Sequence, residues 1–266
     1  MSNSHDHSPA INSILRKFRI IPRLDIKGSN LIKGVQLEGL RVIGDPAEFA
    51  KRYYEGGADE LIYTDVVASL YGRNNLFDVV AKTASYIFVP MTVGGGMRSI
   101  EDVDQILRVG ADKISVNTAA IRRPKLITEI ASQFGSQCCV VEIQARSCGT
   151  NQWTALYDSG REESGLKVID WARQVEELGA GELLLTSVDR DGTRSGVDLD
   201  LVAAVSSSVN IPVIASGGVS SKEDAAGVSI KGGADAVAIG SLLHYGSETI
   251  REIKETAHSM GLGVRF

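Results

Sequence analysis

The stretch Gly110-Ala111-Asp112-Lys113, followed directly by the apolar run ISVNT, is the most informative part of this 266-residue chain. The same arrangement, in which Gly-Ala closes a helical pattern and opens an apolar segment, recurs at 57–60, 179–182 and 233–236. A glycine that ends a helix immediately before a strand is typical of the αβ turn in wound α/β folds. Four copies therefore predict a regular alternation of helices and strands.

Four further apolar runs lie between these copies, namely RIIPRLDI, IFVPMTVGGG, CCVVEIQA and IPVIASGG, which makes eight strand signals. The first strand is expected over Arg19 to Asp25. Helical patterns cover roughly 46–56, 74–85, 99–109, 124–134, 166–178, 198–208, 221–231 and 248–260. Eight parallel strands with helical crossovers predict a (β/α)8 TIM barrel as a single domain over residues 18–266, which is about the length this fold needs. The alternative, a doubly wound open sheet, should carry a glycine-rich fingerprint after the first strand, and none is present there.

Composition narrows the class of partner. The hydrophobic content of 43% supports a large core, and a net charge of -5 without a basic block argues against nucleic acid or an anionic membrane as partner. The polar first residues show no signal peptide, so we expect a cytoplasmic protein whose residues 1–17 form a disordered tail. Cys138, Cys139 and Cys148 are interpreted as buried thiols in a reducing compartment, and neither a metal nor a cofactor is expected.

Glycine clusters divide the chain into two similar half-barrels. Gly94-Gly95-Gly96 and Gly217-Gly218 each end a predicted strand, and about 22 residues later the next strand ends in a small polar pair, Asn117-Thr118 or Gly240-Ser241. Backbone N–H groups at such glycines can approach an oxyanion, and a following helix N-terminus adds its dipole. Two matched sets predict a substrate with a phosphate at each end; the alternative is a pair of tight turns that merely require glycine.

Charged residues are expected at both ends of the barrel. Asp25, Asp65 and Asp191 follow strand ends at the mouth, where barrel enzymes place catalytic groups, and Lys33 in the loop after the first strand could hold an anion. At the other end, the first positions of four strands are charged: Arg19, Glu60, Lys113 and Glu182. Because strand side chains alternate, these four side chains should ring the barrel floor. The ring is either a structural salt-bridge plug or a gate for a small neutral molecule.

Taken together, these residues resemble the cyclase subunit of imidazole glycerol phosphate synthase, the ammonia-using half of a glutamine amidotransferase in histidine biosynthesis. The resemblance runs from about Arg19 to Phe266. It is carried by the stretches RIIPRLDI, GDPAEFAKRYYEGGADEL, TVGGG, GADKISVNTAA, ITEIASQFGSQ, GAGELLLTSVDRDGTRSG and IPVIASGG. The isomerase one step earlier in the pathway shares the half-barrel plan, but GADKISVNTAA and FGSQ fit the cyclase better.

The resemblance implies specific roles. It implies a glutaminase subunit docked at the N-terminal face, ammonia passing through the barrel, and a bisphosphate ribulosyl ribonucleotide at the mouth. Asp25 matches a catalytic aspartate. The implied ammonia gate is Arg19, Glu60, Lys113 and Glu182; one phosphate site is Gly96, Asn117 and Thr118; the other is Gly192, Gly218, Gly240 and Ser241; further cavity positions are Lys33, Asp65, Thr186 and Asp191.

One departure from the family concerns the second catalytic aspartate, whose position holds Gln144 in the run Val141-Glu142-Ile143-Gln144. A glutamine cannot exchange a proton near neutral pH. Glu142 and Arg23 also occupy inward positions that are small or neutral in the family, and two opposite buried charges predict an ion pair. Two alternatives therefore stay open. One is a paralogue that passes ammonia to another amidotransfer, such as amidination of a surface sugar by a third enzyme, and the other is a non-catalytic barrel that only activates its glutaminase.

Overall fold

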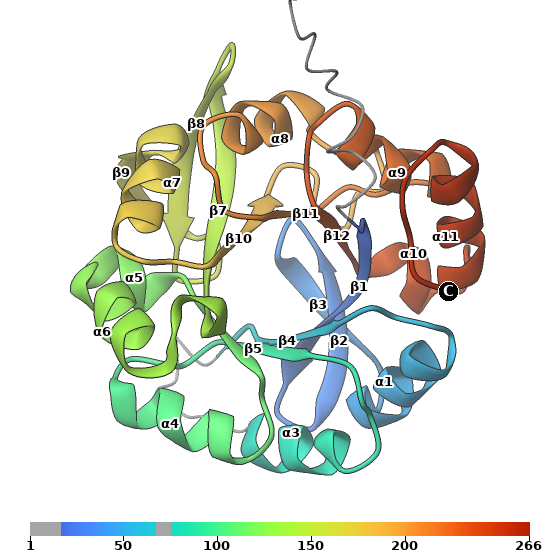
Figure 1. Cartoon of the computed structure of the whole chain (residues 1–266), viewed down its shortest axis with the longest axis horizontal. Helices are drawn as coiled ribbons and strands as arrows, with labels where there is room; N and C mark the ends of the chain where they lie inside the picture. The colour runs from blue at the N-terminus through green and yellow to red at the C-terminus, as the bar shows by residue number, and fades with distance from the viewer. Residues whose placement is uncertain (1–16, 68–75) are drawn as a thin grey trace, which may run out of the picture.

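A computed structural model describes residues 17–67 and 76–266 and has the architecture of a closed parallel barrel surrounded by helices (Figure 1). The eight barrel strands are β1 (Arg19–Lys27), β4 (Leu61–Asp65), β5 (Met91–Gly94), β6 (Lys113–Val116), β7 (Cys139–Gly149), β10 (Glu182–Ser187), β11 (Val213–Ser216) and β12 (Ala236–Ile239). Each pairs in parallel with the next, β1 pairs with β12, and the β7–β10 pairing completes the circle. The predicted (β/α)8 fold is confirmed.

The helices that follow the strands form the outer ring in Figure 1. They are α1 (Pro46–Glu55), α3 (Leu76–Ala84), α4 (Ile100–Arg108), α6 (Lys125–Phe134), α7 (Val168–Glu177), α8 (Leu199–Ser206), α9 (Lys222–Ile230) and α11 (Ile250–Ser259). Local sequence explains several helix starts. Asp45, Ser99, Asp198, Ser221 and Thr249 each accept a hydrogen bond from the first turn of the helix that follows.

Strand side chains alternate between two environments. Outward residues such as Ile20, Leu24, Tyr63 and Leu183 join the core between strands and helices, whereas a second, inner cluster fills the barrel: Ile21, Ile62, Val140, Leu184, Ile214, Ala236 and Ala238. Arg19, Ile21, Arg23 and Asp25 are thus successive inward positions on β1. They define four levels, from the floor at the strand N-termini to the mouth at the C-termini.

Two antiparallel extensions of the barrel wall lie at the mouth, and neither was predicted from the sequence. One is the hairpin β2 (Asn30–Val35) and β3 (Glu38–Gly44), which pairs with β1; the other is β8 (Gln152–Tyr157) and β9 (Glu162–Lys167), which continues from β7. The expectation that Lys33 lies in a loop was therefore wrong, because Lys33 belongs to β2. The helix expected from 166 begins at Val168, after β9.

Each half-barrel also has a short helix after its last strand. A short helix follows β6, α5 (Thr118–Arg122), and another follows β12, α10 (Ser241–His244). Each begins at the polar pair that the sequence repeat singled out. Cys138 and Cys139 are buried as expected, but Cys148 is exposed, so the expectation of a buried thiol was wrong there.

The first described residues pair with the C-terminal segment. Lys17 forms a bridge with Gly263, and Phe18 N donates to Gly263 O at 2.8 Å. The tail expected over residues 1–17 otherwise lies outside the described residues. No described helix is long and apolar enough to cross a bilayer.

Candidate active site at the barrel mouth

A cavity of about 310 Å³ opens at the mouth. We call it the mouth cavity. Its wall includes Asp25 at the end of β1, Lys33 of β2, Glu142 and Gln144 of β7, and Asp191 after β10. The β1–β2 segment, β7 and the loop after β10 thus bring together acidic and basic residues that were predicted at the mouth.

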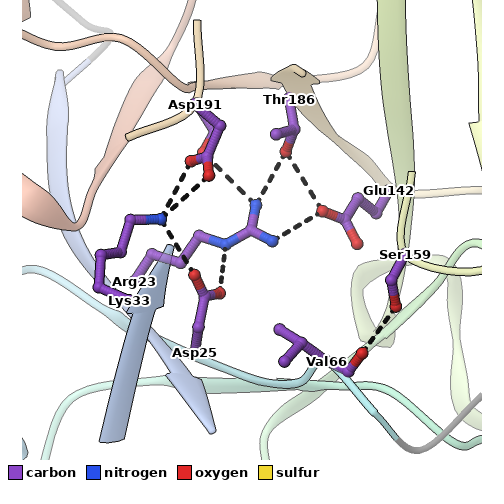
Figure 2. Close-up of polar contacts among 9 residues, drawn as sticks. Arg23, Asp25, Lys33, Val66, Glu142, Ser159, Thr186 and Asp191 are labelled. Atoms are coloured by element: carbon purple, nitrogen blue, oxygen red, sulfur yellow. Dashed lines mark hydrogen bonds and ion pairs between the residues drawn. The ribbon is translucent and has the colours of Figure 1, made fainter. Parts of the chain in front are cut away.

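Arg23 lies beneath this cavity and connects its walls (Figure 2). Its Nη2 is 3.0 Å from Glu142 Oε1, and its Nε donates to Asp25 Oδ1 at 3.1 Å. Its Nη1 donates to Thr186 Oγ1 at 2.8 Å, and Thr186 Oγ1 in turn donates to Glu142 Oε1 at 3.2 Å. The predicted interior pair of Arg23 and Glu142 is confirmed, and it belongs to a larger network. A buried charge held by this many partners is satisfied rather than stranded.

Lys33 closes the other side of Asp25. Its Nζ lies 3.2 Å from Asp25 Oδ2 and 3.1 Å from both carboxylate oxygens of Asp191 (Figure 2). Burial alone would lower the pKa of Lys33, but the ion pairs with Asp25 and Asp191 raise it. Burial would likewise raise the pKa of Asp25, yet Lys33 and Arg23 lower it to about 2. Asp25 is therefore an ionised carboxylate at neutral pH.

Gln144 faces the same cavity from the opposite wall. Its side chain is 5% exposed, and its Oε1 has no hydrogen-bond partner among the described residues. The β8–β9 turn approaches it closely, since a Cβ built on Gly160 would lie 3.8 Å from Gln144 Oε1. That turn is fastened across the mouth by Ser159 Oγ, which donates to Val66 O at 2.7 Å (Figure 2). The amide is thus aimed at the space that a substrate would occupy.

The first glycine cluster lies at the rim of the mouth cavity. Gly96, Asn117 and Thr118 line it, and both polar atoms of the Asn117 side chain lack a partner among the described residues. Gly95 has a φ of 94°, and a Cβ there would lie 2.4 Å from Asp65 O, so only glycine fits. The rim also carries four arginines, namely Arg98, Arg122, Arg123 and Arg161. Glycine-lined backbone, a helix start and cations together suit an anion.

The second glycine cluster lines a separate, much smaller cavity of about 20 Å³, with Gly192, Gly218, Gly240 and Ser241 in its wall. Gly217 repeats the conformation of Gly95, with a φ of 96° and a Cβ position 2.7 Å from Ser187 O. Arg194 covers this cavity, since its Nη2 donates to Ser241 O at 2.9 Å and its Nη1 to Ser247 Oγ at 3.1 Å. Arg23, Lys33 and Asp191 line both cavities, so the two candidate anion sites lie on either side of one charged cluster.

The opposite end of the barrel carries the charged ring expected from the sequence, and we call it the floor ring. Arg19 lies 2.6 Å from Glu60 and 2.5 Å from Glu182, and Lys113 Nζ lies 2.9 Å and 3.0 Å from the same two carboxylates. The four side chains thus alternate in charge around a closed circuit. Both glutamates are nearly buried, whereas the side chains of Arg19 and Lys113 are 21% and 18% exposed. The cations therefore face outward at the floor.

Sequence reasoning missed several members of the site. Ser216 ends β11, and Gly160 and Arg194 lie in loops. All three come close to the mouth only because the barrel is closed and its wall is extended by antiparallel strands. His244 ends α10, where it is buried and its Nδ1 lies 2.6 Å from Tyr53 Oη. Burial lowers the pKa of His244 to about 4, so this imidazole is neutral and structural at pH 7.

Comparison with known proteins places this geometry in a family. The model of the family described as "Histidine biosynthesis protein" matches residues 19–249. A Legionella pneumophila protein named "Imidazole glycerol phosphate synthase subunit HisF" is 60% identical over 206 residues, which cover 77% of this chain and 97% of the relative. Proteins of the same name from Bacillus cereus (strain Q1) and Alkaliphilus metalliredigens (strain QYMF) are 48% and 46% identical; each match covers 93% of this chain and 98% of the relative.

Proposed function

Because the chain belongs to the histidine biosynthesis protein family and resembles its HisF members over nearly the whole barrel, we propose that it is the cyclase subunit of an imidazole glycerol phosphate synthase. In this role it takes ammonia from a glutaminase subunit and uses it on a bisphosphate ribulosyl ribonucleotide. The products are imidazole glycerol phosphate and an aminoimidazole carboxamide ribonucleotide. The observation that carries this proposal is the buried, ionised Asp25 in the mouth cavity, bound to Lys33, which lines both glycine-lined cavities.

The two candidate anion sites fit a substrate with a phosphate at each end. The glycine rim at Gly96, Asn117 and Thr118 would hold one phosphate, and Gly192, Gly218, Gly240 and Ser241 would hold the other. Asp25, Lys33 and Asp191 lie between them and would face the middle of the substrate. There Asp25 would accept protons during addition of ammonia and ring closure. Lys33 is placed to neutralise negative charge that develops in the same step.

The glutaminase would dock at the floor face. Arg19 and Lys113 are the parts of the floor ring that reach the surface, where a partner can contact them. Phe88 precedes β5 at the same end of the barrel and is 79% exposed, with its ring 6.2 Å from that of Tyr54. An exposed phenylalanine that packs on a partly buried tyrosine beside a charged ring suits a protein interface. Ammonia released there would enter the barrel directly beneath the apolar inner cluster.

A second candidate function has one observation in its favour. Gln144 stands where the family resemblance implies a catalytic aspartate, and Arg23 and Glu142 form an ion pair below it. A barrel altered in this way could pass ammonia to another amidotransfer or only activate its glutaminase. The names of the relatives do not favour this alternative, and the paired cavities and Asp25 fit the cyclase.

The purified chain distinguishes the two. It should convert the bisphosphate substrate with free ammonium, and with glutamine when the glutaminase is added. A gene encoding it should also restore growth to a histidine auxotroph that lacks the cyclase. Glutaminase activation without any imidazole product would instead support the second candidate.

A further inference from the structure

The Arg23 side chain crosses the barrel interior at one level, between the apolar inner cluster and the mouth cavity. Its guanidinium is held from four strands: by Asp25 of β1, Glu142 of β7, Thr186 of β10 and Ser216 of β11. The residue is 3% exposed. At this level the side of the barrel bounded by β7, β10 and β11 is therefore closed by a charged group with fixed partners.

The layer below is apolar. Ile21, Ile62, Val140, Leu184 and Ile214 belong to the inner cluster that separates the floor ring from Arg23. Arg23 is the next inward position above Ile21 on β1, about 7 Å further along the strand. A small neutral molecule that crosses the apolar layer from the floor thus meets the guanidinium before it reaches Asp25.

The carboxylates around Arg23 explain why a cation is placed there. Among the groups that contact Arg23 or Lys33 directly, Asp25, Glu142 and Asp191 contribute three negative charges, against the two positive charges of Arg23 and Lys33. Without Arg23, Asp25 and Glu142 would lie close together with an uncompensated charge and would favour ammonium over ammonia. Ammonia is a nucleophile only when it is unprotonated. The ion pairs raise the pKa of Arg23, so the guanidinium keeps its charge at every working pH.

Two buried hydroxyls lie on the β5–β6 side of the barrel, below the level of Arg23, and Ser115 is the next inward position above Lys113 of the floor ring. Thr92 of β5 and Ser115 of β6 are buried, and neither hydroxyl has a hydrogen-bond partner within the described part of the chain. Ser115 also lines the mouth cavity. Buried hydroxyls without partners can offer hydrogen bonds to a passing ammonia molecule, whereas Glu142, Thr186 and Ser216 are already bound to the guanidinium.

We propose that Arg23 and Glu142 form an inner gate, distinct from the floor ring, which directs ammonia along the β5–β6 side and excludes ammonium from the mouth. The gate rests on the proposed function, because it acts on ammonia supplied from the floor. Glu142 anchors the guanidinium on the far wall, and Asp25 anchors it on the near one. The inner gate thereby connects the path of ammonia through the barrel to Asp25, the carboxylate proposed to act at the substrate.

The test is the yield of imidazole product per glutamine hydrolysed, measured on the complex with its glutaminase. The variant Arg23→Met with Glu142→Gln removes both charges while keeping most of the side-chain volume. We expect its yield per glutamine to fall about two- to thirtyfold, the range over which coupling between sites is commonly altered. Lys125→Ala, at an exposed position of the outer helix α6, is the control, and its yield should stay near that of the wild type.

Two results would overturn the inner gate. An unchanged yield in the double variant, even with slower turnover, would make the pair a structural brace. An equal loss with Lys125→Ala would show that the effect does not come from the interior pair. If the double variant does not fold, Arg23→Lys replaces it, since the shorter ammonium cannot bind both walls; a wild-type yield there also refutes the gate. A wild-type chain that forms no product from free ammonium overturns the proposed function itself, and the gate with it.

Discussion

Arg23 Nη2 lies 3.0 Å from Glu142 Oε1, although their strands are on opposite walls of the barrel. β1 and β7 are separated by three strands in either direction around the sheet. The pair therefore spans the interior, and both side chains are almost fully buried. It links the wall that carries Asp25 to the wall that carries Gln144, so stability and the geometry of the mouth depend on the same contact.

Removing one partner should be costly. Arg23→Ala strands Glu142 and deprives Asp25 of one of its two cations, so we expect a loss of about 3–5 kcal/mol in the free energy of unfolding. Arg23→Ala combined with Glu142→Ala should recover part of that loss. Denaturant titration of the wild type, both single variants and the double variant gives the coupling energy. Strictly additive losses would show that the contact contributes no coupling.

The sequence predicted this pair because strand alternation fixes which residues face inward. Arg19, Arg23 and Asp25 lie on one face of β1, and an unpaired charge inside a barrel is too costly to persist. The floor ring followed from the same reasoning. Thr186 and Ser216 could not be predicted as partners of Arg23, because their contacts depend on how far the arginine reaches across the closed barrel.

The antiparallel strands at the mouth, β2–β3 and β8–β9, were harder to predict than the barrel strands. Lys33 was expected in a loop because the stretch after β1 contains glycines and charges rather than a regular apolar alternation. In the structure, β2 gains its strand character by pairing with β1. β9 reads EESGLK and is largely exposed, so its strand conformation comes from pairing with β8 and not from its own sequence.

The floor ring should act on glutamine-derived ammonia more than on ammonia from solution. Lys113→Ala removes the cation that lies 2.9 Å and 3.0 Å from Glu60 and Glu182, which opens the circuit on one side. We expect glutamine-dependent turnover to change by a larger factor than turnover with free ammonium. Both assays can be run on one preparation of the complex, and Lys125→Ala on the outer helix α6 serves as a surface control. Equal factors in the two assays would make the ring purely structural.

Inorganic phosphate should occupy both glycine-lined sites in crystals. One density peak is expected at Gly96, Asn117 and Thr118. The other is expected at Gly192, Gly218, Gly240 and Ser241, where the present cavity of about 20 Å³ is too small for the ion. Binding there should displace Arg194 from Ser241 O, and a shifted Arg194 is the signature to seek. Phosphate at neither site would contradict the assignment of the glycine clusters.

His244 should make stability depend on pH in weak acid. Burial lowers the folded-state pKa of His244 from 6.5 to about 4, so the unfolded chain binds a proton first as the pH falls. Its contribution to stability is complete above pH 6.5 and is lost progressively down to about pH 4. His244→Gln keeps a side chain able to bond to Tyr53 and lacks this titration. Thermal melts of both proteins between these limits should show the advantage of the wild type shrinking with acidity, and a constant difference would refute the assignment.

Gln144→Asp should increase cyclase turnover with free ammonium, an assay in which the glutaminase plays no part. Gln144 Oε1 faces the mouth cavity without a partner among the described residues, opposite an Asp25 that is held ionised. Asp25 can accept a proton but is poorly suited to donate one, and an added carboxylic acid supplies the missing half of the pair. General acid–base groups typically contribute 10²–10⁴-fold, so a rise of about 10²-fold or more is expected. Gln144→Asn, which matches aspartate in shape but cannot titrate, is the control and should not reproduce the gain. A wild-type turnover already near the roughly 1–10 s⁻¹ of ordinary enzymes would contradict this prediction, because another group would then transfer the second proton. The nearest carboxylate on the same face of β7 is that of Glu142.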